Sequence, residues 1–147
     1  MSNQDSSGWS GTRLGMPQVG AEATRSKTMT LQDIARFTDI SGDRNPLHYD
    51  EAAAKRSVFG GLIVQGGVTT GILNALVAED LPGPGSVFLG MELRFLKAVY
   101  VGDTITGRVQ LTQVRADKPI CTLVVEIHNQ KGELCVSGQA TTYTAAL

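Results

Sequence analysis

The stretch SGDRNPLHYDE, residues 41–51, places an acid, an amide and an imidazole on one short connection: Asp43, Asn45 and His48. Carboxylates and imidazoles are side chains that exchange protons with substrates, so this stretch is a candidate for acid–base chemistry. Taken singly, each residue has a commoner structural use. An acid in a loop often hydrogen-bonds nearby backbone N–H groups, here those around Asn45, and a single histidine more often packs. Only the combination of Asp43 and His48 on one connection favours catalysis. Asn45 is expected to have a structural role, bracing the loop that carries them.

Two predicted helices flank this connection and fix its ends. Thr30, followed by an acid in the first turn, is predicted to begin a helix that ends at Gly42. Pro46 lacks an N–H and biases the residue before it toward extended backbone, so residues 43–47 are expected to be irregular. Asp50 then caps a short second helix, EAAAKRS. A connection that is fixed at both ends gives its side chains fixed directions.

Residues 62–79, LIVQGGVTTGILNALVAE, form the most apolar segment and are predicted to be a long buried helix. Its polar residues and the lack of a basic flank argue against a membrane span. Gly66, Gly67 and Gly71 each cost about 1 kcal/mol relative to alanine inside a helix, so a sheet or a ligand is expected to approach this backbone closely. Tight helix packing is the expected reason for Gly71, whereas Gly66 fits either explanation.

After the turn-rich LPGPGS the apolar period changes to two, which is typical of strands. The alternating runs lie at 87–95, 105–111, 121–127 and 134–144. They predict four consecutive strands in an antiparallel meander, and an early strand is expected near Thr24. The helix at 62–79 is the one predicted element large enough to cover the apolar face of this sheet. The predicted fold class is α+β, a curved antiparallel β-sheet wrapped around one long central α-helix.

The composition narrows the classes of partner. The chain has 147 residues, with 13 Lys and Arg against 14 Asp and Glu and no block of like charge. No electrostatic binding to nucleic acid or to a membrane surface is therefore predicted. Cys121 and Cys135 are too few for a disulfide scaffold, and two free thiols suit a cytoplasmic protein. No second histidine lies near His48, so no metal site is predicted, and no phosphate-binding glycine motif is present, so no nucleotide site is predicted.

The first residues differ in composition from the rest. Residues 1–16 are rich in glycine and serine and contain no apolar run, which argues against a signal peptide. They are expected to be a disordered leader, although Trp9 is a large apolar residue to leave in water. Residues 17–147 are expected to form a single domain, long enough for a core of its own.

FTDISGDRNPLH resembles the hydratase signature of the MaoC-like (R)-specific enoyl-CoA hydratases, and LPGPGSVFLGMELRFLKAVYVGDTITGRV resembles the strand region that follows it in that family. The resemblance implies a hot-dog fold, a homodimer or higher homo-oligomer, and hydration of trans-2-enoyl-CoA to (R)-3-hydroxyacyl-CoA without a cofactor. By the same resemblance Asp43 and His48 are the catalytic pair. Gly66 stands where the family has its oxyanion-hole glycine, whose backbone N–H binds the thioester oxygen.

Two positions depart from the family pattern, and two other functions stay open. Gln65 stands where many relatives have histidine, and Asn74 where many have serine; with Asn45 they are candidate lining residues of the active site. An acyl-CoA thioesterase of the same fold is one alternative, since VQGG also resembles the start of the thioesterase helix. Such enzymes use a carboxylate on that helix, which here has no acid before Glu79. The other alternative is a non-catalytic acyl-thioester binding module.

Overall fold

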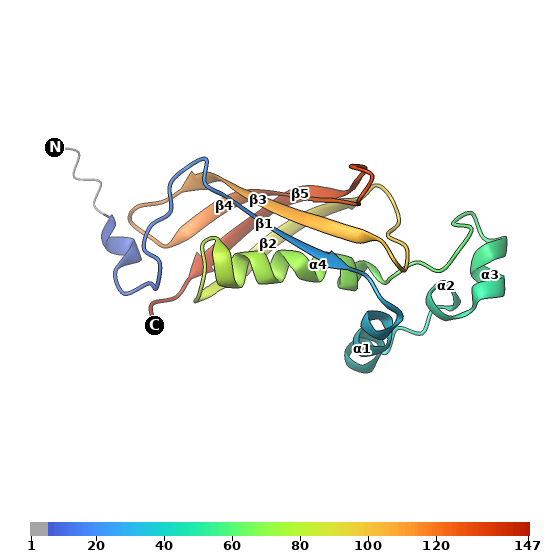
Figure 1. The fold of residues 1–147 in the computed structure, drawn as a ribbon. Helices are drawn as coiled ribbons and strands as arrows, with labels where there is room; N and C mark the ends of the chain where they lie inside the picture. The colour runs from blue at the N-terminus through green and yellow to red at the C-terminus, as the bar shows by residue number, and fades with distance from the viewer. Residues whose placement is uncertain (1–5) are drawn as a thin grey trace.

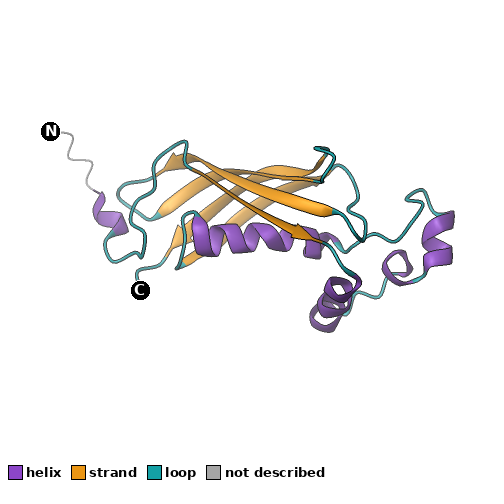
Figure 2. Ribbon diagram, in the orientation of Figure 1, coloured by secondary structure: helices purple, strands orange, loops and turns teal. Residues whose placement is uncertain are grey.

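The computed structural model describes residues 6–147 and consists of one antiparallel sheet, one helix along its face and a group of short helices beyond one end (Figures 1 and 2). In chain order the elements are η1 (Ser6–Trp9), β1 (Glu22–Thr28), α1 (Leu31–Ser41), α2 (Pro46–Tyr49), α3 (Glu51–Arg56), α4 (Gly66–Ala75), η2 (Leu76–Asp80), β2 (Ser86–Phe95), β3 (Thr104–Val114), β4 (Ile120–His128) and β5 (Leu134–Thr144). The predicted α+β class is confirmed.

The strands do not form the predicted four-stranded meander. Their order across the sheet is β1-β3-β4-β5-β2, so β2 pairs with β5 and lies at an edge, although β3 follows it in sequence. The connection of residues 96–103 is not a hairpin turn. Its backbone bonds to the segment before α4, with Val64 N donating to Val99 O (2.9 Å) and Val101 N donating to Leu62 O (3.3 Å). The chain thereby leaves one edge of the sheet and re-enters it beside β1.

The interior of the molecule lies between the sheet and α4. Along β4, and along β3 as far as Leu111, every second residue is buried, and this confirms the predicted period of two. The fully buried side chains of β3 and β4 are Ile105, Val109, Leu111, Leu123, Val125 and Ile127. They face a row of buried side chains on α4 and η2, namely Ile72, Leu73, Leu76 and Val77. Gly107 lies directly under this helical row, because an added Cβ there would lie 2.9 Å from Ile72 Cγ2.

The apolar row of β2 behaves differently from the rows of β3 and β4. Val87, Leu89, Met91 and Phe95 are 55, 57, 40 and 60% exposed. The alternation of β2 was expected to mark an apolar face turned into the core. Because β2 is an edge strand and a bulge between Phe88 and Gly90 breaks its alternation, only Phe88 and Leu93 pack against the core, and its other apolar side chains are largely uncovered within residues 6–147.

The central helix is shorter than predicted at its start. Residues 62–65 are not helical, and Ile63 forms an isolated bridge with Tyr100; the helix begins at Gly66 and continues after Ala75 as the π-helical turn η2. The expectation for Gly71 was wrong, since an added Cβ there would meet nothing within 4 Å among the described residues. Close packing occurs at Gly67, where an added Cβ would lie 2.1 Å from the Phe37 ring.

In place of a disordered leader, residues 8–16 pack against the sheet. Trp9 is 3% exposed, and its indole Nε1 donates to Arg115 O at 2.6 Å. Gly8 N donates to Ala116 O, and Leu147 N donates to Gly11 O. Burying an indole ring removes a large apolar surface from water, which offsets part of the conformational entropy lost when the segment is ordered. Residues 1–5, also part of the expected leader, lie outside the described residues.

No helix among residues 6–147 is long and apolar enough to cross a membrane.

Candidate active site

The connection that carries the acid and the imidazole is built by helix caps. Thr30 and Asp33 form a reciprocal capping box at the start of α1, and that helix ends at Gly42, which has a left-handed φ of 78°. The expected irregular backbone at 43–47 is shorter than predicted, because α2 begins at Pro46. Proline is favoured at the first position of a helix, and Asn45 caps it by accepting a hydrogen bond from the next residue but one.

Asp43 uses its two carboxylate oxygens differently. Oδ1 accepts a hydrogen bond from Asn45 N at 3.0 Å, which is the structural use that a loop acid commonly has. Oδ2 lies 3.6 Å from Nε2 of His48. The Asp43 side chain is 37% exposed, so solvent reaches it. The backbone bond therefore fixes the direction of the carboxylate while one oxygen faces the imidazole.

His48 is held in one tautomer by its surroundings. The residue is 6% exposed, and Nδ1 lies 2.7 Å from the backbone carbonyl of Ile63. A carbonyl oxygen only accepts, so Nδ1 carries the hydrogen and the neutral ring presents a lone pair at Nε2. The 3.6 Å between Nε2 and Asp43 Oδ2 is too long for a direct hydrogen bond. A water molecule bound to both atoms fits this arrangement.

Backbone bonds join this pair to the start of α4. Ile63 N donates to Leu47 O at 3.2 Å, and Ile63 O accepts from His48, so α2 is fastened three residues before Gly66. Figure 1 shows α1, α2 and α3 gathered at the end of the molecule where α4 begins. The first N–H groups of a helix have no acceptor within the helix, and the dipole is positive there. Within residues 6–147 those of Gly66 and Gly67 have no protein acceptor.

Phe95, the last residue of β2, lies beside the exposed Gly66. An added Cβ at Gly66 would lie 3.1 Å from Cε1 of the Phe95 ring. The free N–H of this glycine is therefore bordered by an aromatic ring that is itself 60% exposed. A flat apolar group reaching this N–H would pack against the ring.

Gln65 and Asn74 do not lie where the sequence suggested. Gln65 is 1% exposed and binds α1, with Nε2 donating to Ile34 O (3.1 Å) and to Thr38 Oγ1 (3.3 Å). Asn74 is exposed in a groove of about 630 Å³ between β1, α1 and α4, which neither Asp43 nor His48 lines. Asn45 serves as a helix cap. Within the described residues none of these three side-chain amides hydrogen-bonds the Asp43 carboxylate or the His48 imidazole, although the backbone N–H of Asn45 bonds the carboxylate.

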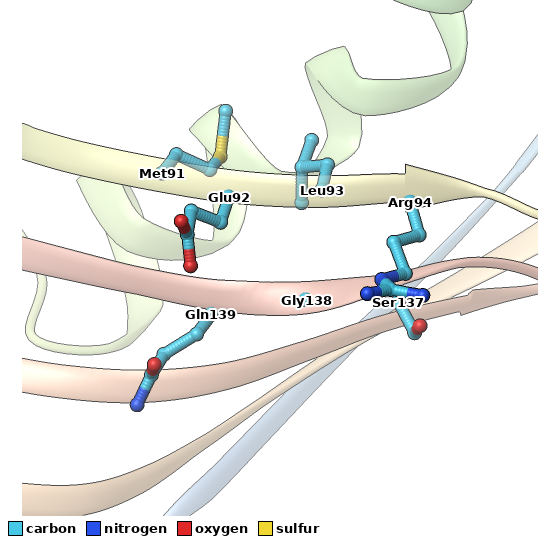
Figure 3. A pocket seen from close by; sticks show the side chains of 7 residues that line it. All are labelled: Met91, Glu92, Leu93, Arg94, Ser137, Gly138 and Gln139. Carbon is cyan, nitrogen blue, oxygen red and sulfur yellow. The ribbon is translucent and has the colours of Figure 1, made fainter.

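A second hollow, of about 590 Å³, lies over β2 and β5. Figure 3 shows Glu92, Ser137 and Gln139 on one side of these strands, with Met91 and Leu93 pointing to the other. The hollow contains none of the residues that the sequence singled out.

Sequence reasoning missed the groups that position the pair. Ile63 acts through its backbone carbonyl, so its residue type carries no signal. Thr38 is buried and hydrogen-bonds the carbonyl of Asp43 at 2.8 Å, yet in the sequence it is one polar residue within an amphipathic helix. Tyr49, which reaches Thr38 Oγ1, directly follows the histidine and could have been noticed there.

A family model described as MaoC like domain matches residues 15–131. The chain belongs to the MaoC-like family. It is 42% identical over 123 residues to an (R)-specific enoyl-CoA hydratase of Aeromonas caviae, a match that covers 84% of this chain and 92% of that protein. It is 32% identical over 127 residues to an (R)-specific enoyl-CoA hydratase of Rhodospirillum rubrum, covering 86% of this chain and 88% of the relative.

Solved structures agree with this family assignment. The (R)-hydratase of A. caviae, described as involved in PHA biosynthesis, superposes with a TM-score of 0.84 at 40% identity, covering 88% of this chain and 98% of that one. An unliganded (R)-hydratase from Pseudomonas aeruginosa gives a TM-score of 0.82 at 30% identity, with 89 and 84% covered. This MaoC-like chain therefore has the hot-dog fold of those hydratases, and the expected fold is confirmed.

Proposed function

We propose that this MaoC-like protein is an (R)-specific enoyl-CoA hydratase, a hydro-lyase that adds water reversibly to trans-2-enoyl-CoA to give (R)-3-hydroxyacyl-CoA. The similarity to the two curated hydratases supports this activity. The single observation that carries the proposal is the pairing of Asp43 Oδ2 with His48 Nε2 at 3.6 Å, each fixed by a backbone hydrogen bond at its other polar atom.

The proposed chemistry uses one water molecule held between these two groups. Asp43 takes a proton from the water while the water oxygen attacks C3 of the enoyl thioester, and His48 Nε2 orients the same water. Negative charge then develops on the thioester oxygen, where the N–H of Gly66 donates to it. Asp43 returns the proton to C2. The product has gained OH at C3 and H at C2, and the protein regains its starting protonation state.

The alternative functions fit the structure less well. Thioesterases of this fold typically use a carboxylate on the central helix, but the candidate position on α4 is Asn74, which lies exposed in a separate groove. The first acid on this element is Glu79, in the π-helical turn at the other end from Gly66. A binding module would require neither the fixed tautomer of His48 nor the free oxygen of Asp43.

One assay separates the three functions. The purified protein is mixed with crotonyl-CoA, and the loss of enoyl-thioester ultraviolet absorbance is followed while free thiol is measured in parallel. Hydration removes the absorbance without releasing thiol, and this is the expected result. Release of thiol in step with the absorbance change would identify a thioesterase. Binding of the thioester with neither change would identify a binding module.

We also propose that the protein is a homodimer, or a higher homo-oligomer, that joins through β2. This strand is a sheet edge and exposes Val87, Leu89 and Met91, apolar side chains that a monomer would leave in water. A second copy paired along β2 would cover them. Light scattering at micromolar concentration should give a mass of at least twice 15.6 kDa. A fully active monomer would contradict the proposal.

We further propose a cytoplasmic location, which the two free and buried cysteines favour. Fractionation of cells that express the tagged chain tests this, and recovery with a membrane or secreted fraction would contradict it.

A further inference from the structure

The catalytic loop is connected to the start of α4 by a second route, which runs through side chains. Its centre is the hydroxyl of Thr38 on α1, which is 4% exposed. Four groups approach that oxygen: Ile34 O (3.0 Å), Asp43 O (2.8 Å), Gln65 Nε2 (3.3 Å) and the Tyr49 hydroxyl. The hydroxyl therefore touches the loop that carries the acid, the residue that follows His48, and the residue that precedes Gly66.

The hydrogen atoms of this cluster can be assigned from the chemistry of its members. The two carbonyls only accept and the Gln65 amide nitrogen only donates, so Thr38 accepts from Gln65. Gln65 Nε2 has a second hydrogen for Ile34 O at 3.1 Å. The Tyr49 hydroxyl has one hydrogen and lies within reach of both Thr38 Oγ1 and, at 3.5 Å, Ile34 O; when it donates to Thr38, the nearer of the two, both lone pairs of Thr38 are filled. Its single hydrogen is then directed at Asp43 O, the shorter of its two carbonyl contacts.

The Gln65 side chain retains one unfavourable feature. Its amide cannot be reversed, because Oε1 would then face the carbonyl of Ile34. As placed, Oε1 is buried and has no partner within residues 6–147. An unpaired buried oxygen opposes folding, so the two hydrogen bonds of the nitrogen are largely offset. Stability alone therefore gives little reason for a glutamine here.

We infer that Gln65, acting through Thr38 together with Tyr49, is a positioning residue that sets the Asp43 carboxylate relative to the backbone N–H of Gly66. The carbonyl of Gln65 belongs to the same peptide unit as the Gly66 N–H, while its side chain holds Thr38 and thereby the backbone of Asp43. One residue thus links the proposed base to the proposed oxyanion donor. This inference rests on the proposed function and deepens it.

The inference predicts a loss of turnover without a matching loss of thioester binding. Thr38→Val keeps the shape of the side chain but removes the hydroxyl, so the Asp43 carbonyl loses its tether. A small misplacement of a catalytic group costs about tenfold or more in kcat. The dissociation constant for saturated butyryl-CoA, which binds without reacting, should stay within about twofold, because the tether acts on the water and not on thioester binding. Thr38→Ser restores the hydroxyl and should recover most of the turnover.

Gln65→Met and a double variant complete the series. Gln65→Met removes both donated bonds and the unpaired oxygen together, so kcat should fall while the melting temperature changes little. The double variant Gln65→Met with Thr38→Val should be scarcely slower than the slower single, since both changes break one connection. Thr112→Val is the matched control. It deletes a hydroxyl bond to the Thr122 carbonyl within the sheet and should leave kcat unchanged.

Amide hydrogen exchange tests the tether without any substrate. The Asn45 and Leu47 N–H groups are protected by bonds within the loop, and in Thr38→Val they should exchange about tenfold faster, but not in Thr38→Ser. If the wild type hydrates no crotonyl-CoA, the proposed function fails while this exchange result still decides the inference. The inference would be overturned if Thr38→Val showed the same amide exchange rates and the same kcat as the wild type. So would a loss in Thr38→Ser as large as in Thr38→Val, or weaker butyryl-CoA binding in step with kcat.

Discussion

The sheet interior and the candidate active site of this MaoC-like protein are held together by different forces. Leu123, Val125 and Ile127 are fully buried, and their contacts are apolar, nondirectional and numerous. Asp43 and His48 are instead directed by single hydrogen bonds, each ending on one backbone atom. The first region tolerates small shifts because no one contact decides it. The second depends on individual bonds, so a small change there should affect turnover before it affects folding.

Leu123→Ala tests the sheet side of this comparison and should have the largest effect on stability. Leu123 is 0% exposed, and truncating a buried leucine costs about 2–5 kcal/mol through lost apolar burial and the cavity left behind. Denaturant unfolding measures the loss. The kcat of the folded fraction should match the wild type, because no bond to the Asp43 loop is touched. A large fall in kcat at full folding would show that the two regions are not separable.

Gly66→Pro tests the site side. Gln65 has φ −61° and ψ 145°, a conformation that residues before proline adopt, and proline is accepted at the first position of a helix. The variant should therefore fold. It lacks the N–H, and losing one oxyanion donor costs about 10²–10³ in kcat. Gly66→Ala is the control, because it keeps the N–H and only crowds the Phe95 ring. Full activity of the proline variant would place the donor elsewhere.

Gly67→Ala and Gly71→Ala apply the comparison to one helix. An added methyl at Gly67 would lie 2.1 Å from the Phe37 ring, so this ring must shift away from α4 and stability should fall by about 1–3 kcal/mol. At Gly71 the methyl meets open space, and alanine should raise helix stability by up to about 1 kcal/mol. Thermal melts of both variants provide the measurement. Equal losses at the two positions would contradict the packing described for α4.

The two cysteines give the smallest predicted effect. Burial raises the pKa of Cys121 to about 12 and also raises that of Cys135. Both stay protonated in the folded protein at pH 8, and only the thiolate reacts. Alkylation by iodoacetamide should be roughly 10²-fold slower, or more, than in the denatured chain. Above pH 9 the unfolded chain ionises its thiols before the folded one, so stability should decline there. Rapid native labelling would contradict this.

Much of the sheet was predictable from the sequence, and the reason is physical. A strand with one face in the core must alternate, so β3 and β4 were visible as runs of period two. The position of β2 was not predictable, because an edge strand with an apolar row has the same pattern as a central one. Trp9 was noticed as out of place in a leader, but nothing in the sequence specifies its acceptor, Arg115 O.

The candidate site was predictable in its side chains but not in its supports. Asp43 and His48 stand out because two proton-exchanging residues share a short connection, and Asn45 was correctly expected to brace it. The hydrogen-bond partner of His48 is a main-chain carbonyl, which every residue possesses. Gln65 is a candidate lining residue only through the resemblance to the family, where many relatives have histidine at this position, and its side chain turns toward α1.

The substitution Asp43→Asn tests the central claim most directly. It keeps the size of the side chain and its bond from Asn45 N, but an amide cannot accept a proton from water at neutral pH. Steady-state hydration of crotonyl-CoA should fall by about 10² or more while the melting temperature stays close to wild type. His48→Gln should behave similarly, and the double variant should be scarcely slower than the slower single. Near-normal turnover in Asp43→Asn, or a melting temperature that falls in step with activity, would contradict the proposed mechanism.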